Sequence, residues 1–194
     1  MLGGGPSLPQ AIPLLKNQCC IAVNNSYQLA PWSISCWFGD VKWWDWHKGF
    51  LESWPNLLAT CCQNSRVQKE AHQLGLDIHS FQRENRTKGL TYSKGMVCWN
   101  GSSGASAINY AYHLGFRKVA LVGFDMRRIE GRKNFHQDHQ EKDHSPFPRH
   151  LSCFPIIAKE APALGLEIIN ATPDSAIKAF PYVPLEELCL TSPK

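Results

Sequence analysis

The chain has no apolar run that approaches the ~20 residues needed to span a bilayer. It also has no block of consecutive lysines or arginines, and its formal net charge is only +4. So small a charge suits a site for an anionic ligand but does not by itself indicate DNA binding. With 43% hydrophobic and 19% charged residues, the composition is typical of a globular protein and argues against disorder. We expect one domain over residues 1–194, with no membrane partner.

The eight cysteines include no Cys-x-x-Cys pair, and Met1 leads directly into glycines rather than into a secretory signal. Both absences argue against a disulfide or zinc framework. The sequence therefore predicts reduced, buried thiols and a cytoplasmic location.

Short apolar runs alternate with segments of helical periodicity. Strands are expected at 19–23, 33–38, 57–61, 76–79, 118–123 and 167–170, and helices at 42–54, 67–74, 103–114 and 151–164. Residues 83–95 and 127–148 are polar and predict surface loops, and 173–194 predicts a tail with a helical turn or two. Alternation with short connections predicts an α/β fold: a doubly wound, mostly parallel sheet in a single three-layer domain.

Glycine, serine and amide residues gather where these strands end. Because parallel strands end at the same edge of a sheet, such residues converge on one rim, where α/β proteins bind ligands. Glycines let backbone N–H groups approach a phosphate, and a helix N-terminus favours negative charge. The alternative is that these loops are only tight turns with a helix cap. The candidate nucleotide-binding residues are Gly3, Gly4, Gly5, Pro6, Ser7, Asn24, Asn25, Ser102, Ser103, Gly104 and Asp125.

Neither glycine loop is a Walker A or a Gly-x-Gly-x-x-Gly motif, so the usual ATP and NAD signatures are absent. Two histidines, His136 and His139, stand three residues apart in the long polar loop. Either can serve as a general base or as a phosphate partner. With Asp138 they can instead bind a metal, although the spacing is no recognised zinc pattern and we predict no metal ligands. The alternative is a solvated polar loop.

The densest aromatic cluster lies at 43–47. We expect Trp43 and Trp46 in the core, because an aromatic stripe at helical spacing is usually buried. Trp44 and His47 are expected to face the site and to bind the acceptor. Asp40, at a strand end just before this helix, is a candidate catalytic carboxylate.

Several of these motifs together resemble a known group. Gly-Gly-Gly-Pro-Ser-Leu at 3–8 is similar to the opening loop of the Rossmann-like bacterial sialyltransferases that use CMP-sialic acid. It is also similar to that of the archaeal 6-hydroxymethylpterin diphosphokinase and of the motility accessory factor glycosyltransferase-like proteins. Ser-Ser-Gly at 102–104 and Gly-Phe-Asp at 123–125 resemble a second signature of this superfamily.

Short bacteriophage members give the greatest overall similarity. They share Asp-x-x-Trp-Trp at 40–44, His-x-x-His at 136–139 and Asn-Ala-Thr-Pro-x-Ser at 170–175. The resemblance implies a Rossmann-like fold, nucleotide contacts and a histidine base, with host cytoplasm as the location if a phage encodes the chain. The nucleotide contacts that it implies are Gly3, Gly5, Ser7, Asn24, Ser102, Ser103 and Gly104. The chain departs from the pattern at its start, because only Met1 and Leu2 precede the glycine loop where a full strand is usual; either that strand is almost absent or the chain begins late.

We expect a transferase that binds a nucleotide-activated donor, most of all a nucleotide sugar. The catalytic residues would be His136, His139 and Asp40. A second hypothesis is an ATP- and Mg²⁺-dependent pyrophosphokinase with Asp40 and Asp125 beside the metal. A third is a non-catalytic nucleotide-binding or virion-assembly protein. The sequence leaves the acceptor open, with nucleic acid among the possibilities because of the arginines and lysine at 127–133.

Overall fold

The computed structural model describes residues 1–16, 18–137 and 145–190. Its sheet is built from short parallel strands. Four of them, β1 (Ile21–Val23), β2 (Ser35–Phe38), β3 (Leu57–Thr60) and β4 (Ile78–Ser80), pair in chain order. Two more, β7 (Lys118–Leu121) and β8 (Glu167–Asn170), pair with each other over their full length.

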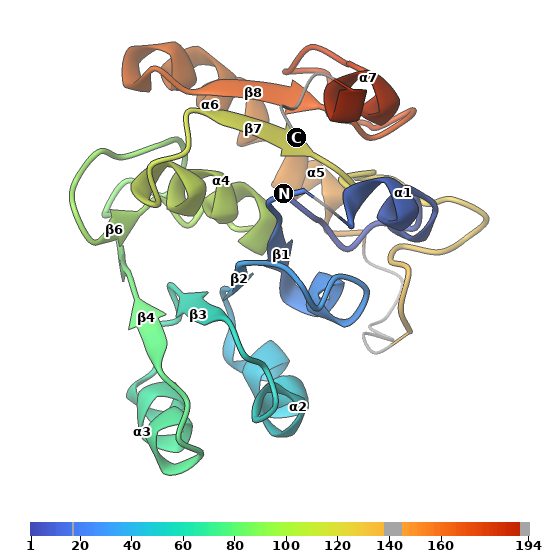
Figure 1. Ribbon diagram of the computed structural model, residues 1–194. Helices are drawn as coiled ribbons and strands as arrows, with labels where there is room; N and C mark the ends of the chain where they lie inside the picture. Colours follow the sequence, from blue (N-terminus) through green and yellow to red (C-terminus); the bar gives the residue numbers. More distant parts are fainter. Residues whose placement is uncertain (17, 138–144, 191–194) are drawn as a thin grey trace.

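Leu2 joins these two groups of strands. It forms parallel bridges to Ala22 on one side and to Val122 on the other. The backbone N–H of Leu2 donates to Ile21 O at 2.9 Å, and that of Gly3 donates to Val122 O at 2.8 Å. The expected first strand is therefore present as one or two paired residues in the middle of the sheet (Figure 1).

The resulting order across the sheet is β4, β3, β2, β1, Leu2, β7, β8. From Leu2 the chain adds strands outward to β4, and then returns to add β7 and β8 on the other side of Leu2. The order thus reverses between Leu2 and β7, which makes this the topological switch point of the sheet. The predicted α/β fold with parallel strands is confirmed.

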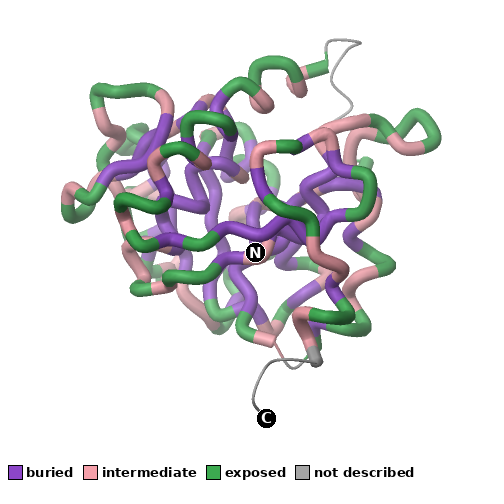
Figure 2. The backbone as a smooth tube through the Cα atoms, turned by 90° about the horizontal axis from the view of Figure 1, so that it is seen from above, coloured by how far each residue is buried: buried purple, intermediate pink, exposed green. Residues whose placement is uncertain are grey.

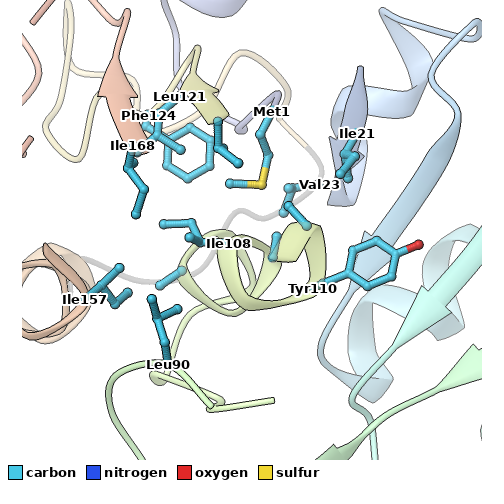
Figure 3. Packing of buried hydrophobic residues seen from close by; sticks show 14 of the residues in the cluster. Met1, Ile21, Val23, Leu90, Ile108, Tyr110, Leu121, Phe124, Ile157 and Ile168 are labelled. Atoms are coloured by element: carbon cyan, nitrogen blue, oxygen red, sulfur yellow. The ribbon is translucent and has the colours of Figure 1, made fainter. Parts of the chain in front are cut away.

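Helices cover both faces of the sheet (Figure 1). Against one face pack α4 (Ser103–His113) and α6 (Phe154–Glu160), as shown by the cluster that joins Ile108 and Ile157 to strand residues such as Val23 and Leu121. Figure 3 shows these side chains gathered around α4. Successive strand residues alternate between faces, so Ala22 packs with the opposite layer.

That opposite layer has two halves. Helices α2 (Val41–Leu51) and α3 (Ser65–Gln73) cover the half formed by β1 to β4. Helices α1 (Leu8–Leu15) and α7 (Leu185–Leu190) cover the half around Leu2 and Val122. Buried segments accordingly run through the middle of the molecule, and exposed ones lie in its outer turns and loops (Figure 2).

Two expected elements differ from the structure. The helix expected over 151–164 is divided into α6 and a 3-10 helix, η2 (Ala161–Leu164), and a separate short helix, α5 (Phe147–Leu151), precedes them. Pro155 and Pro162 lie in the first turns of α6 and η2, because proline lacks the N–H that a helix interior needs. The loop expected at 83–95 is flanked by β5 (Gln82–Arg83) and β6 (Met96–Val97), which pair with each other.

Six of the eight cysteines are buried, Cys189 is half-buried and Cys19 is exposed. Burial raises the pKa of Cys61 to about 11 and that of Cys153 to about 12, so both thiols are protonated at neutral pH. Within the described residues, no helix has the length and apolar character to cross a membrane.

Candidate functional site

The loops that hold the predicted nucleotide-binding residues lie along one edge of the sheet, where its strands end. The glycine loop follows Leu2, a 3-10 helix, η1 (Asn24–Gln28), follows β1, and Asp125 comes four residues after β7. The N-terminus of α4 approaches the same edge. The topology therefore brings the two sequence-distant loops to the switch point.

The glycine loop packs against the segment that follows β7. Gly5 N–H donates to Gly123 O at 2.8 Å, and both the backbone N–H and the hydroxyl of Ser7 donate to Oδ2 of Asp125, at 3.2 and 2.9 Å. A Cβ at Gly5 would overlap Oδ2 of Asp125 and lie 2.6 Å from Gly123 O. Gly5 is therefore needed for this close approach, whatever the ligand.

Asp125 is the most informative residue of the edge. It is 1% exposed, and burial raises the pKa of its carboxyl group, an effect that the Ser7 hydroxyl and backbone N–H oppose. Only Oδ2 is satisfied: among the described residues Oδ1 has no hydrogen-bond partner. A buried acceptor without a partner is costly, and a ligand hydroxyl or amine would satisfy it.

The glycine loop and the N-terminus of α4 both pack against the ring of Phe124. A Cβ at Gly3 and a Cβ at Gly104 would each lie 2.8 Å from an atom of the Phe124 ring. The two loops are thus one phenyl ring apart. Ser102 is the N-cap of α4, with its hydroxyl accepting from Ala105 N–H at 3.5 Å, so its side chain has a structural role. Ser103, the first residue of α4, is buried as well.

The two asparagines after β1 have different roles. Asn25 is buried, and its Oδ1 accepts from Trp43 Nε1 at 2.8 Å, which ties η1 to α2. Asn24 has a left-handed backbone (φ 51°) and is half-buried, and its Oδ1 has no hydrogen-bond partner in the described part of the chain. Asn24 and Asp125 thus each present an unsatisfied oxygen, one on either side of the Leu2 strand.

His136 comes to the same place from the polar loop. Phe135 N–H donates to Gly4 O at 3.0 Å, and this bond docks the loop on the glycines. A Cβ at Gly4 would lie 3.9 Å from Nε2 of His136. The imidazole is therefore beside the first glycine loop, whereas His139 and Asp138 lie outside the described residues.

Asp40 is the N-cap of α2: its Oδ1 accepts from Trp43 N–H at 2.9 Å. It follows β2, whereas Asp125 follows β7, three strand positions away. At a strand spacing of ~4.8 Å this separates their strands by roughly 14 Å, too far for one ion to bind both carboxylates directly. No cluster of three metal-ligating side chains exists among the residues that the structure describes.

The structure corrects the expectation for the aromatic helix. Trp44 is 0% and His47 2% exposed, whereas Trp46, expected in the core, is 45% exposed. Trp44 Nε1 donates to Glu70 at 2.8 Å, and His47 Nδ1 lies 3.0 Å from the Tyr27 hydroxyl. Because α2 turns residues 43, 44, 47 and 51 toward the sheet, neither Trp44 nor His47 can reach an acceptor at the edge.

Sequence reasoning missed Arg83 and Trp99. Arg83 was expected in an exposed loop, but it is half-buried at the strand ends, and its guanidinium lies 4.2 Å from the centroid of the Trp99 ring. The only available signal was its place three residues after β4. The 127–133 cluster, in contrast, makes surface contacts such as Arg132 with Glu130 at 3.2 Å and Arg128 with Gly131 O at 2.7 Å.

A cavity of about 330 Å³ opens beside the glycine loop. It lies between α1, α7 and the turn at 129–132, and its lining includes Ser7, Gly123, Arg132, Tyr182 and Glu186. A cavity of this size at the switch point can hold a small ligand or part of a larger one.

Comparisons with protein-family models, with curated proteins and with solved structures found no match for this chain. The residues and their geometry therefore carry the functional argument.

Proposed function

We propose that the chain is a transferase that binds a nucleotide-activated donor, a nucleotide sugar above all, at the carboxyl edge of its sheet. The observation that carries the proposal is the pair of unsatisfied oxygens, Asn24 Oδ1 and Asp125 Oδ1, on either side of the glycine loop at the switch point. Ribose hydroxyls and base amino groups are the donors that such acceptors need. The sequence resemblance to CMP-dependent glycosyltransferase-like proteins supports the same ligand class.

His136 is the residue that we assign to proton transfer. In glycosyl transfer the acceptor's nucleophilic oxygen or nitrogen forms a bond to the sugar's anomeric carbon. The bond from that carbon to the donor phosphate breaks, and the nucleotide leaves with the electron pair. A ring nitrogen of His136, beside Gly4, takes the proton that the acceptor loses. We place the acceptor beside Gly4 and His136, since Trp44 and His47 are buried elsewhere.

The pyrophosphokinase alternative receives less support. That hypothesis places Asp40 and Asp125 beside one Mg²⁺, and the two residues follow strands roughly 14 Å apart. Asp40 also already caps α2. A non-catalytic nucleotide-binding protein shares the proposed site and differs only in the role of His136.

The test is thermal unfolding of the purified protein with CMP, UDP, GDP, ATP and their sugar conjugates, each with and without Mg²⁺. A ligand at 100 times its Kd stabilises a protein by about 2.7 kcal/mol, which raises Tm by roughly 5–10 °C in a chain of this size. We expect a response to a nucleotide or its sugar conjugate that does not depend on Mg²⁺ and is lost in Ser103→Trp.

A response to ATP only with Mg²⁺ would favour the pyrophosphokinase. The absence of any response would contradict the proposal and its nucleotide-binding alternatives together. If a nucleotide sugar binds but is neither transferred nor hydrolysed, and His136→Gln leaves its Kd unchanged, the non-catalytic protein is the better description.

A further inference from the structure

Arg83 brings a positive charge to the candidate edge, and no carboxylate of residues 1–16, 18–137 or 145–190 pairs with it. Its Nε donates to Cys61 O at 2.8 Å and its Nη2 donates to Gly39 O at 2.7 Å, the carbonyls just beyond β3 and β2. Arg66 and Arg86, in contrast, are paired with aspartate or glutamate. The charge of Arg83 is therefore not neutralised by the protein where it is half-buried.

The two carbonyls fix the guanidinium plane and leave part of it unused. A guanidinium has five N–H donors, and the carbonyls of Cys61 and Gly39 accept from two of them. Stacking on Trp99 orients the group further. An arginine held in this way is preorganised to bind an oxyanion through its remaining N–H groups.

Gly39 brings this arginine to the N-terminus of α4. A Cβ at Gly39 would overlap the Trp99 ring and would lie 2.9 Å from the hydroxyl oxygen of Ser103. The carbonyl of the same glycine accepts from Arg83. Arg83, Trp99 and Ser103 therefore meet around one peptide unit, beside a helix of 11 residues whose N-terminus favours negative charge.

Hydrogen-bond acceptors and positive charge lie at different places along the carboxyl edge. Near the switch point the unsatisfied groups are the acceptors of Asn24 and Asp125, which need donors. Toward the ends of β2 and β3, beyond Ser103, the group that needs a partner is the cation of Arg83. A nucleotide has these same two parts, a base and ribose with N–H and O–H groups and a phosphate with negative charge.

We infer that Arg83 and Ser103 form a phosphate subsite, and that it orients a nucleotide with its phosphate toward β2 and β3 and its nucleoside toward Asn24 and Asp125. The inference extends the proposed function and depends on it for the nucleoside part of the ligand. The phosphate thereby lies away from the glycine loop, whose glycines serve the close packing against Asp125.

Arg117 is a matched control for Arg83. It also lies over an aromatic ring, 4.4 Å from the Tyr112 centroid, and it also donates to two backbone carbonyls, those of Tyr112 and Phe116. It immediately precedes β7 and so lies at the opposite edge of the sheet. Arg117 is exposed where Arg83 is half-buried, so it controls for the loss of the charge, of the ring contact and of the carbonyl hydrogen bonds.

The test measures Kd by calorimetry for matched pairs, cytidine with CMP, uridine with UMP, guanosine with GMP and adenosine with AMP. For the pair that binds wild type, we expect Arg83→Gln to weaken the monophosphate at least tenfold and the nucleoside less than twofold. Arg117→Gln should leave both unchanged. Equal loss for nucleoside and monophosphate in Arg83→Gln, or no loss for either, would overturn the subsite.

A second measurement needs no substitution. Phenylglyoxal labels accessible arginines, and peptide mass spectrometry gives the extent at each position. We expect 10 mM inorganic pyrophosphate, roughly the concentration that a weak anion site requires, to protect Arg83 at least threefold and to leave Arg117 unprotected. Equal labelling with and without pyrophosphate would overturn the subsite. Nucleoside binding in that case leaves the proposed function standing, whereas binding of neither nucleoside nor nucleotide would sink the proposed function itself.

Discussion

The amino and carboxyl edges of the sheet belong to the same strands, but their charged and polar groups differ. At the amino edge, helices stop in left-handed glycines such as Gly115 and Gly165, and the nearby charges pair with each other, as Lys118 does with Glu167 at 3.3 Å. At the carboxyl edge, Asn24 and Asp125 each have a buried oxygen, and Arg83 has a cation, for which the described part of the chain provides no hydrogen-bond partner or carboxylate, respectively. Buried groups without hydrogen-bond partners among the described residues also occur before β2, β3 and β7, at Ser33 Oγ, Trp54 Nε1 and His113 Nε2. What distinguishes the carboxyl edge is that its two acceptor oxygens and its cation lie beside the glycine loop and the N-terminus of α4, and this is the physical basis for placing a ligand there.

The largest expected effect is a loss of turnover on substitution of His136, with His113 as the control. His136 lies beside Gly4, and His113 lies in the last turn of α4, where burial lowers its pKa. We expect His136→Gln to lower transfer or donor hydrolysis by about 10²–10⁴-fold with little change in donor Kd, as for loss of a general base. Turnover with the best nucleotide sugar measures it. Turnover lost equally in His113→Gln would show that the effect is structural.

Two glycines test whether the carboxyl edge is packed as described. Gly5→Ala should destabilise the fold by about 2–4 kcal/mol, because the added Cβ overlaps Asp125. Gly49→Ala, at an exposed position in the last turn of α2 with no atom within 4 Å of the new Cβ, should stabilise it by about 0.5–1 kcal/mol. Urea unfolding gives both values. Equal effects at the two positions would contradict the close packing of the glycine loop.

The pH dependence of stability sharpens the account of Asp125. Its pKa is raised in the folded protein, so the protonated form is the one that folding favours. Stability relative to Asp125→Asn should therefore fall as the pH rises above the unfolded pKa of about 4. Urea titrations of both proteins from pH 4 to 8 measure the difference. If the stability of the wild type relative to Asp125→Asn instead rose with pH over this range, the pKa of Asp125 would be lowered by folding. Its carboxylate would then be well satisfied, contrary to the account.

The smallest expected effect concerns Asn24. Asn24→Gly keeps a residue that tolerates the positive φ and removes only the side-chain amide. Nucleoside affinity should fall by about 3- to 10-fold, the value of one hydrogen bond, while Tm changes little. Asp174→Gly, at an exposed position with the same φ of 51°, provides the control. An unchanged Kd in Asn24→Gly would remove Asn24 from the site.

Most of the fold could be predicted because hydrophobic pattern and turn chemistry agree along the chain. The last strand is found where it was expected, at Glu167–Asn170, and α4 begins at Ser103 as its cap and small residues indicate. The role of Leu2 could not be foreseen, because a strand reduced to one or two residues has no periodicity. It receives its hydrogen bonds from both neighbouring strands, a tertiary property.

The candidate site was predictable only in part. Strand ends that share an edge could be found from the chain order, and this placed Asn24, Ser103 and Asp125 together. Which face of α2 turns inward could not, because tryptophans at 43, 44 and 46 give the helix apolar residues on several sides. The position of Arg83 could not be predicted, because its partners are backbone carbonyls and the sequence of side chains does not indicate them.

The central claim is that the ligand binds at the carboxyl edge, beside Asn24, Asp125 and Arg83. Hydrogen exchange measured by mass spectrometry, with and without the nucleotide that raises Tm most, tests it directly. We predict slower exchange in 3–8, 24–28, 101–106 and 123–126 at the carboxyl edge, and no change in the amino-edge turns at 75–77, 115–118 and 165–167. Protection confined to the amino-edge turns, or absent from the carboxyl edge, would contradict the account.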